Sequence, residues 1–231
     1  MNTAYTTTIN IDNMYNETFK NAQEAFEYYY DIIPRHGEDF SDTKALFNVG
    51  FTILNPLDNE IKTSYRKWNS KYAHSEWLWY LSGDPNIQKL GDIYGKIPKI
   101  WKRMANIRGQ VNSNYGYQWN RNDQLDAIIT KLRTEPTTRQ ACISIYDGKE
   151  IEKYYNDTPC TYAINFTVLN EKLNMSVMMR SNDLWFGFCN DQYCFSLLQK
   201  YIAECINIDP GTYFHFVNNI HLYNRNLNAK Q

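Results

Sequence analysis

The sequence predicts a single α+β domain over residues 1–231. Two observations predict this class. Apolar residues recur at helical spacing in the first half of the chain and again near its end, and several extended runs lie between these helical regions. In addition, 231 residues with 43% hydrophobic content suit one sizeable core, and no linker, repeat or low-complexity tract divides the chain.

Four stretches carry apolar residues at the spacing of an amphipathic helix, and each ends at a residue or turn that breaks helices. Pro34 is expected to stop the first helix. Pro136 is expected to stop the third, for which Asp123 is the expected N-cap. The expected helices cover residues 16–33, 71–81, 124–135 and 192–206.

Five runs have the extended pattern of β-strands. Two of them are expected to form a hairpin through Asn170-Glu171-Lys172. Helices and strands that follow one another in this order favour an α+β layer over a doubly wound fold. The expected strands cover residues 45–54, 141–146, 161–169, 173–180 and 212–217.

The composition excludes several broad classes of function. A net charge of -1 and a pI near 6.4 give no overall field that would attract nucleic acid or an acidic membrane surface. No run is long enough for a membrane span, and Met1–Asp12 lacks the pattern of a secretory signal, so a cytoplasmic protein is expected. The five cysteines lack Cys-x-x-Cys spacing and are expected to be thiols. A metal site built from Cys189, Cys194 and Cys205 is the weakest alternative, because their spacing fits no zinc pattern.

Two single residues point to chemistry. Glu76 lies inside an apolar helix, where a charged carboxylate costs several kcal/mol unless it is paired or protonated. The alternative is a solvent-facing turn of that helix. Cys160 follows a proline at the start of a strand, and a nearby arginine would favour its nucleophilic thiolate. An arbitrary cysteine is more often an inert buried thiol.

Two polar groups near strand ends suit a nucleotide. The cluster Arg180-Ser181-Asn182-Asp183 offers a guanidinium, a hydroxyl and further polar groups for a phosphate and a sugar, although a surface turn would use the same residue types. His221 and Tyr223 are two residues apart in an extended segment, so their side chains should lie on the same face and could contact one sugar.

These features resemble the thymidylate synthase family in six motifs that occur in the family's order from Glu76 to Tyr223. The resemblance implies a mixed β-sheet packed with helices, and a homodimer with one sheet face at the interface. It also implies 5,10-methylenetetrahydrofolate as co-substrate and no metal. The matching motifs are Ser75 to Ile87, Asn114 to Trp119, Glu135 to Arg139, Thr158 to Cys160, Arg180 to Asp183 and His221 to Tyr223.

The resemblance also implies a role for each matching residue. Cys160 would be the nucleophile, Glu76 would move protons, and Tyr115 would support the network around Glu76. Trp101 and Asp183 would contact folate. The expected nucleotide-binding residues are Arg35, whose loop matches more loosely, Arg139 from the partner subunit, Arg180, Ser181, Asn182, Asp183, His221 and Tyr223.

Asp191 bears on the substrate within the family. Thymidylate synthases carry asparagine at this position, because an amide can pair with uracil. A carboxyl group can accept from the exocyclic amine of cytosine and, when protonated, donate to N3. The run Met179 to Asp191, together with Thr161, resembles phage deoxycytidylate hydroxymethylases. We therefore expect dCMP hydroxymethylation, in the host cytoplasm if the chain is viral.

Other departures from the family leave two alternatives. Gln140 replaces a second arginine, Met104 replaces a tryptophan, and the chain stops at Gln231, before the segment that closes over folate in synthases. One alternative is a methylase that acts on dCMP or dUMP. The other is a nucleotide- or RNA-binding relative without turnover, suggested by basic residues between Lys96 and Arg108.

Overall fold

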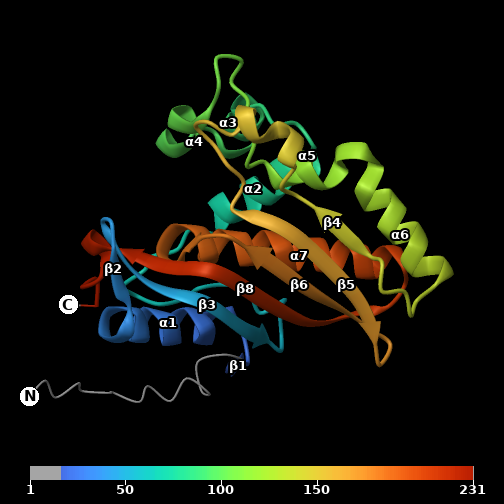
Figure 1. The fold of residues 1–231 in the computed structure, drawn as a ribbon, viewed down its shortest axis with the longest axis horizontal. Coiled ribbons are helices and arrows are strands. Elements are labelled where there is room, and N and C mark those ends of the chain that lie inside the picture. Colours follow the sequence, from blue (N-terminus) through green and yellow to red (C-terminus); the bar gives the residue numbers. More distant parts are fainter. Residues whose placement is uncertain (1–16, 231) are drawn as a thin grey trace, which may run out of the picture.

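A mixed β-sheet organises the part of the chain that the computed structural model describes, residues 17–230 (Figure 1). Its strand order is β1-β3-β8-β6-β5-β4, with β2 paired to β3 and β7 paired to β8. The pairs β1–β3, β6–β8 and β7–β8 are parallel and the others are antiparallel, so the expected mixed sheet is confirmed. The strands are β1 (Glu17–Phe19), β2 (Glu38–Phe40), β3 (Thr43–Ile53), β4 (Cys142–Ser144), β5 (Thr161–Leu169), β6 (Lys172–Met179), β7 (Asn182–Asp183) and β8 (Asp209–Tyr223).

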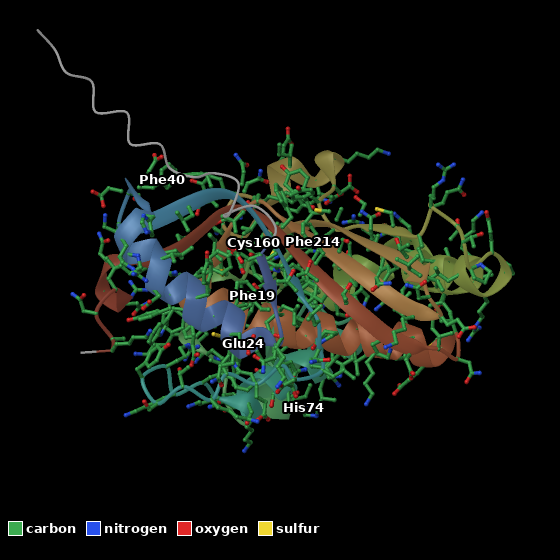
Figure 2. All side chains as sticks on the ribbon, turned by 90° about the horizontal axis from the view of Figure 1, so that it is seen from below. Phe19, Glu24, Phe40, His74, Cys160 and Phe214 are labelled. Carbon is green, nitrogen blue, oxygen red and sulfur yellow. The ribbon has the colours of Figure 1, made fainter. Side chains whose placement is uncertain are left out.

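Helices cover one face of this sheet. Helices α1 and α7 contact the central strands, and α2 packs on α7 to form the next layer, where the exposed His74 marks the outer side of α2 (Figure 2). Short helices α3 to α5 and helix α6 continue from α2 towards β4. The helices are α1 (Ala22–His36), α2 (Ser70–Leu81), α3 (Ile87–Tyr94), α4 (Lys99–Met104), α5 (Tyr115–Asn120), α6 (Gln124–Thr134) and α7 (Cys189–Cys205).

The other face of the sheet is only partly covered by the chain. Strand β8 alternates between fully buried residues, such as Tyr213 and Val217, and half-buried residues, such as Phe214 and Phe216. Met178 on the neighbouring β6 is also half-buried. Because successive side chains of a strand point to opposite faces, these apolar groups form an uncovered surface on the side away from the helices.

The hairpin and the strands around it are placed as expected. Strand β5 has the expected bounds, and β6 is shifted by one residue. Asn170 and Glu171 both have positive φ and form a two-residue turn between Leu169 and Lys172, which are paired. This is the backbone that a tight hairpin with right-handed strand twist requires.

Several expected boundaries were wrong. Helix α1 begins at Ala22, with the Asn21 side chain as its N-cap, and it continues through Pro34 to His36. A proline in the last turn removes only its own N–H bond, and the Gly37 N–H still closes the turn on the Ile33 carbonyl at 2.8 Å. Residues 1–16, including Met1–Asp12 and the expected helix start at Asn16, lie outside the described residues.

Other differences concern short elements and strand length. Helices α3, α4 and α5 have only six to eight residues, too few for a periodic pattern to identify them. Asp123 lies at the N-cap position of α6, but its side chain makes no capping hydrogen bond. Strand β8 is much longer than expected, because it begins at Asp209, which does not form a separate turn with Pro210, and continues past Val217 to Tyr223.

One irregular turn leads into helix α7. Residues Leu184–Phe188 form a π-helical turn, wider than an α-helical turn, and the Asp183 side chain caps it by accepting from the Trp185 N–H at 2.9 Å. Among residues 17–230, no helix is long and apolar enough to cross a membrane.

Candidate active site

Helix α2 places Glu76 in the interior. Asn69 caps the helix by accepting from the Tyr72 N–H at 2.9 Å, and the side chain of Glu76 is directed inward with only 4% of the residue exposed. The pKa of Glu76 is raised to about 8, mainly by burial; the hydrogen bond from Tyr72 opposes the shift, and the nearby charge of Asp191 adds to it. The solvent-facing alternative for Glu76 was therefore wrong, and this carboxyl can hold a proton near neutral pH.

Strand pairing brings Cys160 and Arg180 together. Cys160 precedes β5 and Arg180 follows β6, and the Arg180 N–H donates to the Cys160 carbonyl at 2.8 Å. The Arg180 guanidinium also donates to the Thr158 carbonyl at 2.8 Å and lies 3.7 Å from Cys160 Sγ. Figure 2 shows Cys160 near the middle of the molecule, in the same region as Phe214 of β8.

The electrostatics of Cys160 differ from the expectation. Burial raises the pKa of the Cys160 thiol to about 11, and Arg180 only partly opposes that shift, while Asp191, Asp157 and Asp183 add to it. Arg180 alone therefore does not favour the thiolate within one chain. A further positive charge near the sulfur would lower the pKa of the thiol.

Asp191 lies in the first turn of α7 and faces the same region. Its Oδ2 accepts from Asn182 Nδ2 at 2.7 Å. Burial raises the pKa of Asp191 to about 7, the Asn182 hydrogen bond opposes this, and the charge of Asp183 adds to it. Gly187 leaves room for the pair, because a Cβ there would lie 2.9 Å from Asn182 Nδ2. A protonated carboxyl is therefore accessible to Asp191 near neutral pH.

Tyr115 closes the inner side of the site. It is 4% exposed, and charges on Asp191 and Cys160 both act on its hydroxyl, whose pKa burial raises well above the usual value. Its position depends on Gly116, because a Cβ at Gly116 would lie 1.7 Å from the Tyr80 carbonyl oxygen on α2. Only glycine permits this close contact between α5 and α2.

Three of the polar residues expected for phosphate and sugar share one pocket of about 450 Å³. Arg180, Ser181 and His221 line it, together with residues of the β2–β3 turn. The parallel pairing of β7 with β8 sets Asp183 beside His221, and each influences the charge of the other. The Tyr223 ring packs edge-on against His221, with ring centroids 5.6 Å apart.

Two expected arginines lie elsewhere in this chain. The guanidinium of Arg35 pairs with Asp31 at 2.6 Å on the exposed side of α1. Arg139 is exposed in the loop before β4, where the Ala141 carbonyl accepts from the Phe166 N–H. Phe166 is six residues along β5 from Cys160, which corresponds to about 20 Å at the rise of a strand. Arg139 therefore cannot reach Cys160 of its own chain without a large rearrangement.

The surroundings of Trp101 and Asp183, which were expected to contact folate, are aromatic. Phe186, three residues after Asp183, is 49% exposed, and the Arg66 guanidinium lies 5.5 Å from its ring centroid. Trp101 is 9% exposed and packs edge-on against Trp79. The exposed ring of Phe186 offers a stacking surface that suits the flat rings of a folate, whereas Trp101 is largely covered by its neighbours.

Sequence reasoning missed three residues of this region. Tyr72 donates to Glu76 Oε1 at 2.8 Å, and its position four residues before Glu76 was the available signal. Asp157 is 2% exposed and accepts from the Ser113 N–H at 2.7 Å, which joins the segment before Cys160 to the segment before Tyr115. Arg66 donates to the Trp185 carbonyl at 2.6 Å. No sequence pattern singled out the last two.

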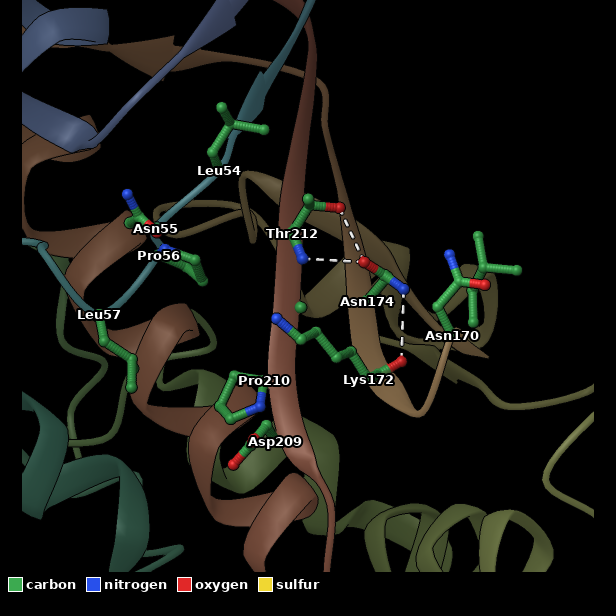
Figure 3. Close-up of a pocket in the computed structure, with 12 residues that line it drawn as sticks. Leu54, Asn55, Pro56, Leu57, Asn170, Lys172, Asn174, Asp209, Pro210 and Thr212 are labelled. Atoms are coloured by element: carbon green, nitrogen blue, oxygen red, sulfur yellow. Dashed lines mark hydrogen bonds between the residues drawn. The ribbon is translucent and has the colours of Figure 1, made fainter.

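A larger pocket of about 580 Å³ lies at the opposite end of the sheet, beside the β5–β6 hairpin (Figure 3). Asn174 is fully engaged there, since its Oδ1 accepts from the Thr212 N–H and hydroxyl, each at 2.8 Å. None of the residues expected to act in catalysis lines this pocket. Within residues 17–230, no cluster of three or more His, Cys, Asp or Glu side chains could hold a metal ion.

Comparisons with known proteins agree with the geometry. The family model for thymidylate synthase matches residues 37–231. The deoxycytidylate 5-hydroxymethyltransferase of Enterobacteria phage T6 is 33% identical over 175 residues, which cover 69% of this chain and 69% of that protein. The proteins of the same name from phages T4 and T2 are each 32% identical over 178 residues, again with 69% of either chain covered.

Proposed function

Because the chain belongs to the thymidylate synthase family, we propose that it transfers a one-carbon unit from 5,10-methylenetetrahydrofolate to carbon 5 of dCMP and releases 5-hydroxymethyl-dCMP. The chain is a one-carbon transferase that acts on pyrimidine nucleotides, and enzymes of this type use methylenetetrahydrofolate as co-substrate. The proposal adds the base, the product and the residue roles.

The protonatable carboxyl of Asp191 is the observation that carries the choice of cytosine. Asn182 holds one of its oxygens, and burial brings its pKa to about 7. A protonated Asp191 can donate to N3 of cytosine and accept from the exocyclic amine, a pair of bonds that matches cytosine and not uracil. The similarity to phage enzymes named for deoxycytidylate supports the same base.

Cys160 and the arginines would begin the reaction. The Cys160 thiolate would form a bond to carbon 6, which makes carbon 5 nucleophilic towards the one-carbon unit. Arg180 would bind the nucleotide phosphate together with Ser181, and His221 and Tyr223 would bind the deoxyribose. Once the phosphate is bound, Asp191 would fix the base and stabilise the charge that develops at N3.

Glu76 would accept and return protons in the later steps. After carbon 5 has attacked the methylene group, the network of Glu76 and Tyr115 would accept the carbon 5 proton as the bond from the methylene carbon to the folate nitrogen breaks and tetrahydrofolate leaves. Water would then add to the exocyclic methylene carbon that remains on the base. The Cys160 to carbon 6 bond breaks at the end and returns the thiol. A carboxyl whose pKa is about 8 can both accept and return a proton at neutral pH.

The assay incubates the purified chain with 5,10-methylenetetrahydrofolate and either dCMP or dUMP, and identifies the products by mass spectrometry. A 5-hydroxymethyl product from dCMP is the expected result. A methyl product from either nucleotide would replace the proposal by a reductive methylase. Nucleotide binding without any product would favour the relative without turnover.

We also propose that two copies of the chain complete each active site, since the family is generally homodimeric. The uncovered sheet face with Phe214 and Phe216 supplies apolar surface for the contact. Arg139, about 20 Å along the sheet from Cys160 of its own chain, would act in the partner's site and add the positive charge that the Cys160 thiol needs.

Mixing inactive variants tests this arrangement. Arg139→Ala and Cys160→Ser chains are each expected to be inactive, but a mixed dimer would contain one intact site. Random exchange should therefore restore about a quarter of the wild-type activity. No restoration after proven exchange, or a monomer at micromolar concentration in sedimentation, would contradict the shared site.

A further inference from the structure

One side-chain hydroxyl reaches the carboxyl of Glu76 in the part of the chain that the structure describes. Tyr72 lies one turn earlier on α2, and its Oη is 2.8 Å from Glu76 Oε1. The indole Nε1 of Trp101, on α4, is 2.8 Å from the same Tyr72 oxygen. The Tyr72 ring packs edge-on against Tyr94, with ring centroids 5.2 Å apart. Trp101, Tyr72 and Glu76 thus form a short chain of hydrogen bonds.

The direction of this chain is fixed by its first member. An indole N–H can only donate, so the Tyr72 oxygen must accept from Trp101. The hydroxyl has a single hydrogen, and the remaining contact at hydrogen-bond distance is Glu76 Oε1, so that hydrogen is donated to Oε1. A donor that itself accepts a hydrogen bond is also a stronger donor, which tightens the contact with Glu76.

This direction limits where Glu76 can carry its own proton. A carbonyl oxygen accepts a hydrogen bond more strongly than the hydroxyl oxygen of a carboxylic acid, so the bond that Tyr72 donates to Oε1 favours the acid form that carries its proton on Oε2. We propose that Tyr72 is a positioning residue that holds Glu76 Oε1 as the carbonyl oxygen and confines the exchangeable proton to Oε2. The inference rests on the proposed function in one respect, since Oε2 would then be the atom that exchanges protons with the nucleotide.

Other titratable groups near Glu76 do not fix the proton in this way. Tyr80 lies on the same helix, and Asp191 and Cys194 lie on α7. Asp191 raises the pKa of Glu76 through its charge, whereas the hydrogen bond from Tyr72 lowers it. Removal of the Tyr72 hydroxyl should therefore raise the pKa of Glu76 and free its Oε1.

The test is an infrared titration of the protonated carboxyl, identified as the C=O stretching band that is lost in Glu76→Gln. In Tyr72→Phe the band should move to higher frequency, because the carbonyl oxygen loses its hydrogen bond. Its titration midpoint should rise by about one unit or more, since a hydrogen bond to a charged group is lost. Trp101→Phe should shift both readouts in the same direction, by less.

Tyr94→Phe is the matched control, because it removes a neighbouring hydroxyl that accepts from Asn69 and not from this chain. It should leave the frequency and the midpoint unchanged. In the kinetic arm, Tyr72→Phe should lower kcat with little change in KM for dCMP and should move the limb of the pH profile that belongs to Glu76 to higher pH.

An unchanged frequency and midpoint in Tyr72→Phe would overturn the inference. Equal shifts in Tyr72→Phe and Tyr94→Phe would also overturn it, since both would then reflect packing. The infrared readout needs no turnover. If the wild-type chain makes no product but the band shifts in Tyr72→Phe, the assignment of Tyr72 stands and the proposed function fails.

Discussion

Replacing Glu76 by glutamine is expected to change how the stability of the protein depends on pH. Glu76 is 4% exposed, and burial raises its pKa from 4.5 to about 8. The unfolded chain releases this proton near the ordinary value, whereas the folded chain keeps it until the higher one. Glu76 therefore makes its full contribution to the free energy of unfolding below the pKa that it has in the unfolded chain. That contribution is lost as the pH rises towards the pKa that it has in the folded chain.

The size of the effect follows from the gap between the two pKa values. One pKa unit corresponds to about 1.4 kcal/mol, so a gap of roughly 3.5 units makes the loss at most about 5 kcal/mol near pH 9. Glutamine has nearly the same shape, cannot ionise, and keeps an oxygen that can accept from Tyr72. Glu76→Gln should therefore be markedly more stable than the wild type at high pH, and nearly equal to it near pH 5.

Urea unfolding at a series of pH values measures this difference directly. Glu204→Gln is the matched control, because Glu204 is an exposed residue of α7 paired with Lys200 and should give a small difference at every pH. A stability difference between Glu76→Gln and the wild type that stays constant from about pH 5 to about pH 9 would refute the reasoning. It would mean that Glu76 does not change its protonation state in the folded chain, and a role in proton transfer would then be lost.

Three further changes are predicted. Cys160→Ser should abolish product formation but keep dCMP binding, measured by calorimetry. Cys142→Ser, at an exposed position on β4, should retain turnover. Product formation by Cys160→Ser would show that Cys160 is not the nucleophile. Asp191→Asn should shift the ratio of kcat/KM from dCMP towards dUMP by about 10- to 100-fold, because the carboxyl hydrogen bond to N3 of cytosine is lost and an amide can pair with uracil, a difference on the order of 1 to 3 kcal/mol. A retained cytosine preference would contradict the role of Asp191. His215 is buried, and burial lowers its pKa to about 3, so the unfolded chain binds this proton first as the pH falls. The free energy of unfolding of the wild type should therefore fall by about 2 kcal/mol between about pH 8 and pH 5. His215→Phe should remove that loss in thermal or urea unfolding, and an unchanged acid slope would show that other groups cause it.

Periodic patterns predicted the long elements, because each buries one face against the core. The segments around α2, β5, β6 and α7 were placed within a few residues. The helices between Ile87 and Asn120 were missed because they are too short to repeat an apolar pattern, although asparagine caps, Asn86 and Asn114, precede two of them. Helix α1 continues through Pro34 because a proline in the last turn removes only its own N–H bond, while the Gly37 N–H still donates to the Ile33 carbonyl.

The sequence predicted which residues make up the candidate site, but not how they contact one another. The motifs identified Glu76, Cys160 and Asp191, and the structure brings all three into one region where their charges act on one another. The hydrogen bond from Asn182 to Asp191 spans the π-helical turn, and the contact between Asp157 and Ser113 joins two loop segments that are far apart in the sequence, so neither follows a local pattern. The upward shift of the Cys160 pKa was not predicted, because the extent of desolvation depends on packing around the thiol.

If Asp191 selects the base as proposed, the π-helical turn at Leu184–Phe188 offers a way to change that selection through the length of the chain. A π-helical turn holds one residue more than an α-helical turn, so deletion of a single residue there could leave a regular helix. Such a deletion would rotate the start of α7 by about 100° relative to β7 and turn the Asp191 side chain away from Asn182. Over evolution, a change of length in this turn could therefore alter which base is accepted without any substitution at Asp191. Alignments that treat such a gap as neutral would overlook the event.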